Sequence, residues 1–159
     1  MDDDRPRTNY SGDTLNQLTM RIWKKLFTLE QLNRLSRNCA VSHLGIRFTA
    51  FGDDWLEAAM PVDRRTTQPF GLLHGGISAA LAETVGSMAG WLCADDNQTA
   101  AGIEINASHL RPVKSGEITA RATPVRLGQT LQVWDIHLRD QQDKLCCVSR
   151  LTLSVVQHG

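Results

Sequence analysis

A histidine, two glycines and a glutamate lie close together in the stretch QPFGLLHGGISAALAE, which spans residues 68–83. His74 precedes Gly75 and Gly76, and Glu83 follows the histidine after nine residues. Glycine lets a ligand approach the main chain closely, and the first N–H groups of a helix are free to donate hydrogen bonds. Such donors suit a carbonyl oxygen that gains negative charge, and a carboxylate can serve as a base or a nucleophile. These residue types therefore indicate acyl transfer to water.

The spacing separates the histidine from the glutamate along a helix predicted over residues 74–93. Nine residues correspond to roughly 13 Å along the helix axis, and His74 and Glu83 point in nearly opposite directions. One chain is therefore unable to bring both side chains to the same atom. If both are catalytic, His74 of one subunit must act with Glu83 of another, and a two-fold dimer contains two such sites. Ser87 lies one turn beyond Glu83 and is predicted to hold water or to orient the carboxylate.

The faces of this helix predict what surrounds it. An apolar stripe within a sector of about 80° should pack on a sheet, and its members are Ile77, Leu81, Val85, Met88 and Leu92. Gly86 and Gly90 lie on the other side, although glycine in a helix interior costs about 1 kcal/mol relative to alanine. Because small residues let another backbone come close, we interpret this side as the contact with a second subunit.

The rest of the chain predicts a sheet that the helix must cover. A capping box of Thr28 and Gln31 predicts a short helix, and two strands flank a turn at residues 52–54. After the long helix, four segments rich in β-branched residues are separated by short connections and must be antiparallel. A sheet that is apolar on one face needs cover, and here one helix must supply it. The predicted fold is α+β, with an antiparallel sheet curled around one long central helix.

Length and charge limit the classes of function. The chain has 159 residues, so we assign residues 21–159 to a single domain and expect residues 1–20 to form a disordered polar tail. Lys plus Arg equals Asp plus Glu at 17 each, so no global field favours nucleic acid or an anionic membrane as a partner. The N-terminus does not have the pattern of a secretion signal, and no apolar run is long enough to cross a bilayer.

The cysteines and histidines predict the compartment and the absence of a metal. The four cysteines form no Cys-x-x-Cys pair, so we interpret them as reduced core thiols of a cytoplasmic protein. The five histidines show no ligand spacing, so no structural metal is expected.

Two common catalytic motifs are missing from this stretch, and the functional residues also have ordinary explanations. GLLHGG lacks the Gly-Lys-Ser/Thr ending of a phosphate-binding loop, and Ser78 lacks the Gly-x-Ser-x-Gly elbow of serine hydrolases. A lone glutamate on a helix is more often a solvated residue than a catalytic one. In the same way, His74 is open to interpretation as a helix cap, and Ser87 as a structural residue.

The stretch MPVDRRTTQPFGLLHGGISAALAETVGSMAG resembles the hotdog-fold acyl-CoA thioesterases, and the similarity runs from RIWKKLFTLEQLN to KLCCVSRLTLSVV. GLLHGG followed by ALAE is a fairly specific combination. The resemblance implies a hotdog fold, dimers that pair into homotetramers, and Glu83 as nucleophile or general base. It also implies that Gln68, His74 and the Gly75 N–H of the partner subunit bind and polarise the thioester. Ser87 would assist with water.

Coenzyme A is anionic, so its nucleotide needs cations even on a neutral protein. HLRPVK supplies His109 and Arg111, predicted on one face of a strand, and RLGQTL supplies Arg126 at a turn with Gly128. The resemblance points to both segments for this role, including Leu110, together with Gly102. Met88, beside Ser87, is predicted to contact the acyl group. No cofactor is expected, since coenzyme A belongs to the substrate and water is the second reactant.

Within the family, the chain looks closest to two kinds of relative. One is the hydrolases of 1,4-dihydroxy-2-naphthoyl-CoA in menaquinone synthesis, and the other is the thioesterases that clear misloaded aryl groups from a carrier protein in enterobactin synthesis. Both imply an aromatic acyl group, and the second keeps a carrier protein open as a partner. A hotdog dehydratase also sets a histidine against a carboxylate, but Gly75 and Gly76 after His74 favour a thioesterase. A non-enzymatic alternative is an acyl-CoA-binding regulator on the same scaffold. Such a protein could dispense with the Glu83 carboxylate, which this chain keeps.

Overall fold

The computed structural model describes residues 22–157, so the tail expected over residues 1–20 lies outside the described residues. The long helix expected over residues 74–93 forms over Gly75–Leu92, and none of the helices within the described part of the chain is long and apolar enough to span a bilayer. The elements follow one another as α1 (Leu29–Leu35), α2 (Ala40–His43), β1 (Arg47–Phe51), β2 (Leu56–Val62), α3 (Gly75–Leu92), β3 (Gln98–His109), β4 (Gly116–Leu127), β5 (Leu131–Arg139) and β6 (Leu145–Gln157).

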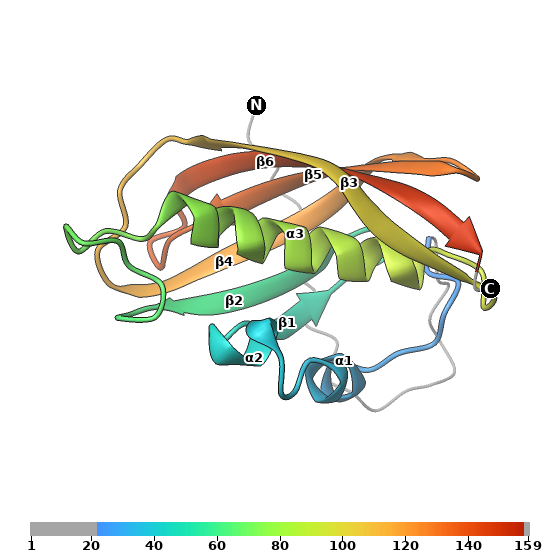
Figure 1. The fold of residues 1–159 in the computed structure, drawn as a ribbon, viewed down its shortest axis with the longest axis horizontal. Coiled ribbons are helices and arrows are strands. Elements are labelled where there is room, and N and C mark those ends of the chain that lie inside the picture. The colour runs from blue at the N-terminus through green and yellow to red at the C-terminus, as the bar shows by residue number, and fades with distance from the viewer. Residues whose placement is uncertain (1–21, 158–159) are drawn as a thin grey trace.

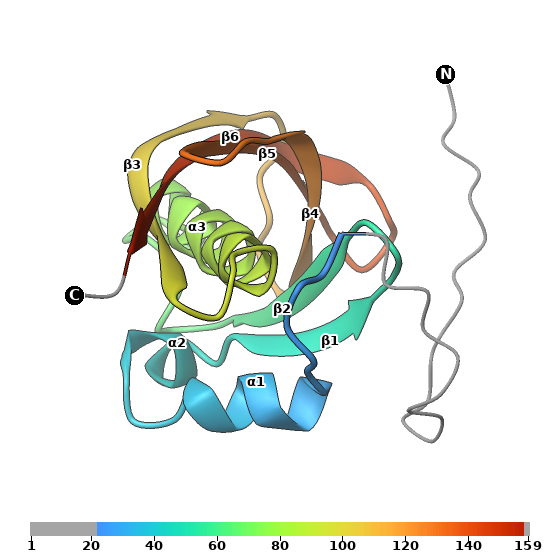
Figure 2. The ribbon, with the colours of Figure 1, turned by 90° about the vertical axis from the view of Figure 1, so that its right-hand side faces the viewer.

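All six strands belong to one antiparallel sheet, in the order β1-β2-β4-β5-β6-β3. β3 pairs with β6 and not with β4, its successor in the chain, so the β3–β4 connection crosses the sheet. The sheet faces α3 along the length of the helix (Figure 1). Seen along the helix, the sheet wraps around α3 from β3 through β6, β5 and β4 to β2 and β1 (Figure 2). The predicted antiparallel sheet curled around one long helix is confirmed.

Alternating side chains of the strands build the core against α3. Trp134, Ile136 and Leu138 of β5 are fully buried, whereas the residues between them are only partly buried. On the helix, Leu81, Val85 and Leu92 of the predicted stripe are also fully buried, but Ile77 and Met88 are only partly buried. The sheet curls around the helix and encloses more than one stripe, so residues outside the predicted sector are buried too.

Gly86 and Gly90 contact the chain's own sheet, so their assignment to a subunit contact is wrong. Both glycines are buried within the described chain. A methyl group at Gly86 would stand 2.6 Å from Cδ2 of Leu151, and one at Gly90 would overlap Leu153. The Gly90 carbonyl also accepts a hydrogen bond from the buried Gln132 Nε2 at 3.2 Å. The small residues therefore bring the curled sheet close to the helix.

Gly90→Ala should lower the free energy of unfolding by about 1–3 kcal/mol, because the added methyl group overpacks the contact with Leu153. The better helix propensity of alanine offsets about 1 kcal/mol of that loss. Urea denaturation measures the change. The penalty should shrink in a Leu153→Ala background, and an equal penalty in both backgrounds would contradict this packing.

The two edges of the sheet differ. At the β1 edge, the Asn33 side chain of α1 donates to the Phe48 carbonyl at 3.0 Å and accepts from the Phe48 N–H at 2.8 Å. At the other edge, β3 runs for 12 residues with no further strand beside it in the described chain. Ile103 on β3 is 58% exposed. A long edge strand with exposed apolar side chains is a template for pairing with another chain.

The cysteines are free, but they are not all in the core. Cys93, Cys146 and Cys147 are buried as expected, whereas Cys39 is exposed at the start of α2, which corrects the prediction for that residue. Burial raises the pKa of the Cys93 thiol to about 12, so this thiol stays protonated and unreactive near neutral pH.

Candidate active site

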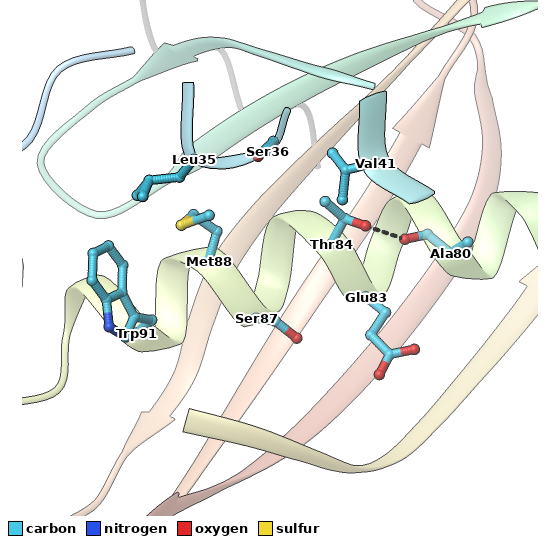
Figure 3. Close-up of a pocket in the computed structure, with 9 residues that line it drawn as sticks. All are labelled: Leu35, Ser36, Val41, Ala80, Glu83, Thr84, Ser87, Met88 and Trp91. Atoms are coloured by element: carbon cyan, nitrogen blue, oxygen red, sulfur yellow. Dashed lines mark hydrogen bonds between the residues drawn. The ribbon is translucent and has the colours of Figure 1, made fainter. Parts of the chain in front are cut away.

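Glu83 lies in a pocket where the wrapped sheet leaves one side of α3 uncovered. The pocket has a volume of about 540 Å³. Glu83 and Ser87 project from one side of α3, while Thr84 and Met88 project toward α1 and α2 (Figure 3). The lining residues are Leu35, Ser36, Val41, Ala80, Glu83, Thr84, Ser87, Met88 and Trp91. Of the predicted site residues, the structure therefore brings Glu83, Ser87 and Met88 together.

The Glu83 carboxylate has room on the side of β3 and no partner of its own in the described chain. A methyl group in place of a hydrogen of Gly102 would stand 2.9 Å from Glu83 Oε1. Gly102, a predicted substrate-binding residue, is thus a neighbour of the carboxylate. No group within residues 22–157 donates a hydrogen bond to this carboxylate or forms an ion pair with it. Both oxygens are available to water or to a ligand.

His74 is the N-cap of α3 and lies outside the pocket, whose lining on this helix begins at Ala80. Its Nδ1 accepts a hydrogen bond from the Gly76 N–H at 2.9 Å. A neutral imidazole that accepts through Nδ1 carries its proton on Nε2, which is then available as a donor. The Gly75 N–H finds no acceptor among the described residues. Both donors lie at the N-terminus of α3, where the helix dipole favours negative charge.

Gln68 belongs to the loop that leads into this helix. The loop is closed by a β-bridge between Thr67 and Leu73, and the Gln68 carbonyl oxygen Oε1 accepts hydrogen bonds from the N–H groups of Phe70 and Leu72. With its oxygen engaged, Gln68 keeps its amide nitrogen as a donor. The predicted set of donors, Gln68, His74 and the Gly75 N–H, therefore lies at or next to the start of α3.

His109 and Arg111 are placed differently from the prediction. β3 ends at His109, so Arg111 follows in the connection and the two do not share a strand face. A methyl group at Gly75 would stand 2.8 Å from His109 Nε2, so the imidazole lies against the start of α3. Arg111 instead lines a second depression of about 530 Å³ with Leu110, Lys144 and Leu145. Lys144 was not expected from the sequence.

Arg126 and Gly128 lie near the turn between β4 and β5, where the Gly128 N–H donates to the Leu131 carbonyl at 2.8 Å. A methyl group at Gly128 would stand 3.3 Å from Arg126 Nε. The turn with Arg126 comes just before β5 begins, whereas Lys144, which lies beside Arg111, comes after β5 ends. The two arginines therefore lie toward opposite ends of β5. A strand of this length spans roughly 27 Å. One chain therefore does not gather Arg111 and Arg126 around one phosphate.

The predicted catalytic residues thus form two groups within one chain. Glu83, Ser87, Met88 and Gly102 surround the pocket, and no donor at the start of α3 lines that pocket. The carboxylate group offers base or nucleophile chemistry, and the donors at the helix N-terminus suit a carbonyl oxygen that gains charge. Among the described residues, no group of three or more His, Cys, Asp or Glu side chains is placed to hold a metal ion.

An antiparallel sheet wrapped around one helix, with a free carboxylate on the open side of that helix, is the arrangement expected for a hotdog thioesterase. A sequence model described as the thioesterase superfamily matches residues 70–147. A curated relative from Cronobacter turicensis, named proofreading thioesterase EntH, is 55% identical over 135 residues, which cover 85% of this chain and 98% of the relative.

Solved structures show the same similarity. The crystal structure of a thioesterase from Haemophilus influenzae is 65% identical, covers 86% of this chain and 95% of its own, and superposes with a TM-score of 0.85. A thioesterase from Staphylococcus aureus, solved with one glutamine replaced by alanine, is 32% identical with a TM-score of 0.70 over 72% of this chain and 96% of its own. A second structure of that protein carries alanine in place of a glutamate.

The chain belongs to the thioesterase superfamily and has the hotdog fold. It is a thioester hydrolase, and among its named relatives it is close to the proofreading thioesterases.

Proposed function

We propose that the protein hydrolyses acyl-CoA thioesters with an aromatic acyl group, such as 1,4-dihydroxy-2-naphthoyl-CoA, at a site shared by two subunits. One observation carries the proposal: the Glu83 carboxylate is free in an apolar pocket, and the donors that would polarise a thioester lie at the start of the same helix, about two and a half turns away. A second copy of the chain can supply those donors, whereas the same chain cannot.

In the proposed reaction, Nε2 of His74 of the partner subunit and the Gly75 N–H of the partner subunit donate to the thioester carbonyl oxygen. Gln68 of the partner subunit contributes its amide. Glu83 either takes a proton from water as the water oxygen attacks the carbonyl carbon, or attacks that carbon itself to form an anhydride that water cleaves. In both cases the C–S bond breaks, the thiol of coenzyme A leaves with a proton, and the acid forms. Ser87 assists by holding the water.

Two features support this arrangement. The exposed edge of β3 offers a strand for pairing with a second copy, and the predicted contact would bring Gly102 and Glu83 close to the partner. In addition, the glutamine and the glutamate replaced in the two Staphylococcus aureus structures are as far apart in sequence as Gln68 and Glu83 are here. Pairing of dimers into homotetramers, which the family resemblance implies, is part of the same proposal. No cofactor enters the reaction.

A carrier protein loaded with an aryl group is the second candidate substrate, in place of coenzyme A. The relatives named proofreading thioesterase, at 55% and 54% identity over 135 residues, favour it. Both candidates present the same phosphopantetheine thioester to Glu83, so they differ in what surrounds the entrance to the site and not in the chemistry.

The experiment is a hydrolysis panel that measures release of free thiol. It compares dihydroxynaphthoyl-, hydroxybenzoyl- and straight-chain-CoA thioesters with aryl-loaded carrier protein. The main proposal predicts the highest kcat/KM for an aromatic CoA thioester. The highest value for the loaded carrier protein would favour the second candidate, and hydration of an enoyl-CoA without thiol release would contradict both.

Arg111→Gln and Lys144→Gln should each raise KM for an acyl-CoA by roughly 10-fold, since each removes a charge-assisted contact with a phosphate of the nucleotide. The value of kcat should stay nearly constant because neither side chain reaches the thioester. The same acyl group on N-acetylcysteamine, which lacks the nucleotide, should show no change in KM. Lys114→Gln, an exposed lysine outside the depression, is the matched control. Equal effects on both kinds of substrate would contradict this assignment.

A further inference from the structure

The pocket beside Glu83 is polar at one place and apolar toward the C-terminal end of α3. Beyond Glu83 and Ser87, the lining continues with Met88 and Trp91 of the helix and with Leu35 of α1. In Figure 3, Trp91 stands at one end of the row of lining side chains, beyond Met88 and across from Leu35. Trp91 lies eight positions after Glu83, which corresponds to roughly 12 Å along the helix. A group held at Glu83 that extends in this direction meets the indole ring.

The Trp91 ring is held from outside the pocket by a lysine of the segment before α1. The Lys25 ammonium lies 5.4 Å from the centre of the indole ring, within the range of a cation–π contact. The same ammonium donates to the carbonyls of Ala94 and Asp95, at 2.6 Å each, just after the end of α3. The Lys25 N–H also donates to the Leu92 carbonyl at 3.1 Å. A cation is favourable at a helix C-terminus, so these contacts reinforce one another.

Lys24 provides a natural comparison because its backbone makes the same contact with the end of α3, but its side chain does not touch the Trp91 ring. Its N–H also donates to the Leu92 carbonyl, at 2.8 Å, but its ammonium pairs with Asp95 at 2.9 Å and its side chain is 55% exposed. Of these two neighbouring lysines, Lys25 alone has its charge against the indole ring.

We infer that Trp91, held by Lys25, forms the end wall of the acyl pocket and sets the largest acyl group that the enzyme hydrolyses. This inference rests on the proposed function, since it takes the thioester carbonyl to lie at Glu83. Trp91 touches the acyl group and is a specificity-determining residue. Lys25 does not reach the acyl group and is a positioning residue. An indole ring fixed on one side by a cation presents a firmer wall than a free one, so selectivity depends on both residues.

Trp91→Ala should open the end of the pocket. The ratio of kcat/KM for dodecanoyl-CoA to that for benzoyl-CoA should rise by at least roughly 10-fold, because small differences in fit within an apolar pocket change kcat/KM by about 10- to 200-fold. Trp91→Phe, which keeps an aromatic ring and the packing, should give a smaller rise. Melting temperatures report whether both variants fold, and Trp91→Phe keeps the test valid if Trp91→Ala does not. An unchanged ratio in a folded variant overturns the inference.

Lys25→Met, which keeps an unbranched side chain of nearly the same length and removes the charge, should shift the ratio in the same direction as Trp91→Phe. Lys24→Met should leave it unchanged. A Lys25 that only stabilises the fold would lower kcat/KM for both thioesters by the same factor, and that result would overturn its positioning role. A separate result tests the proposed function. If Glu83→Gln hydrolyses both thioesters at the normal rate, the active site is elsewhere and the proposed function is wrong. The Trp91 variants test only the ratio of kcat/KM between the two thioesters.

Discussion

Glu83→Gln should lower kcat for thioester hydrolysis by about 10²- to 10⁴-fold, because the amide keeps the shape of the side chain but is neither a base nor a nucleophile. The melting temperature should hardly change, since the carboxylate has no hydrogen bond or ion pair within the described chain to lose. Steady-state release of thiol from a benzoyl-CoA substrate measures the loss.

Glu30→Gln is the control for this variant. Glu30 is also an exposed helical glutamate, but it pairs with Arg34 on α1 and does not line the pocket. It should retain the wild-type kcat. Hydrolysis by Glu83→Gln within twofold of the wild-type rate would exclude the role assigned to Glu83.

Gly75→Pro should lower kcat by about 10²- to 10³-fold, the usual cost of losing one donor to an oxyanion. Gly75 is the first residue of α3, a position at which proline fits a helix and removes only an N–H that the helix does not use. His74 before it is already in the extended region, with φ −69° and ψ 128°, which proline requires of its predecessor.

Gly75→Ala is the matched variant, because alanine adds the same Cβ against His109 while it keeps the N–H. Any loss of activity in Gly75→Ala therefore measures the contact with His109. The difference between the two variants measures the N–H alone. Equal activities of Gly75→Ala and Gly75→Pro, with both proteins folded, would show that this donor has no part in catalysis.

Local signals in the sequence predicted the elements well. The capping box of Thr28 and Gln31 begins α1, and the Gln31 side chain accepts from the Thr28 N–H at 2.9 Å. The two strands expected on either side of the turn at residues 52–54 form as β1 and β2, and the start of α3 at the His-Gly-Gly sequence also agrees with the structure. These features depend on neighbours within a few residues, where residue type and spacing decide the conformation.

Features that depend on distant segments were predicted less well. A glycine on a helix indicates that something comes close but not what, so Gly86 and Gly90 were assigned to a second subunit and in fact contact the chain's own sheet. Leu35 and Val41 reach the pocket only because α1 and α2 pack beside α3. Trp91 follows Ser87 by one helical turn, so the helical spacing is the sequence signal that places it on the side of the pocket.

The proposed division of the site between two chains rests on the fold. One α-helix carries the donors at its first residue and the carboxylate two and a half turns later, and the sheet wraps around the helix on its other sides. In the proposed dimer, a second copy that pairs along the open β3 edge places the start of its own α3 near Glu83. The central claim is therefore that one functional site needs two chains.

Mixing two inactive variants, Glu83→Ala and His74→Ala, tests this claim most directly. After unfolding and refolding together, half of the dimers are mixed, and each mixed dimer contains one site with both Glu83 and His74 of the partner subunit intact. Because half of the dimers are mixed and one of their two sites is intact, we expect recovery of roughly a quarter of the wild-type activity. No recovery, although native mass spectrometry shows mixed dimers, would contradict it.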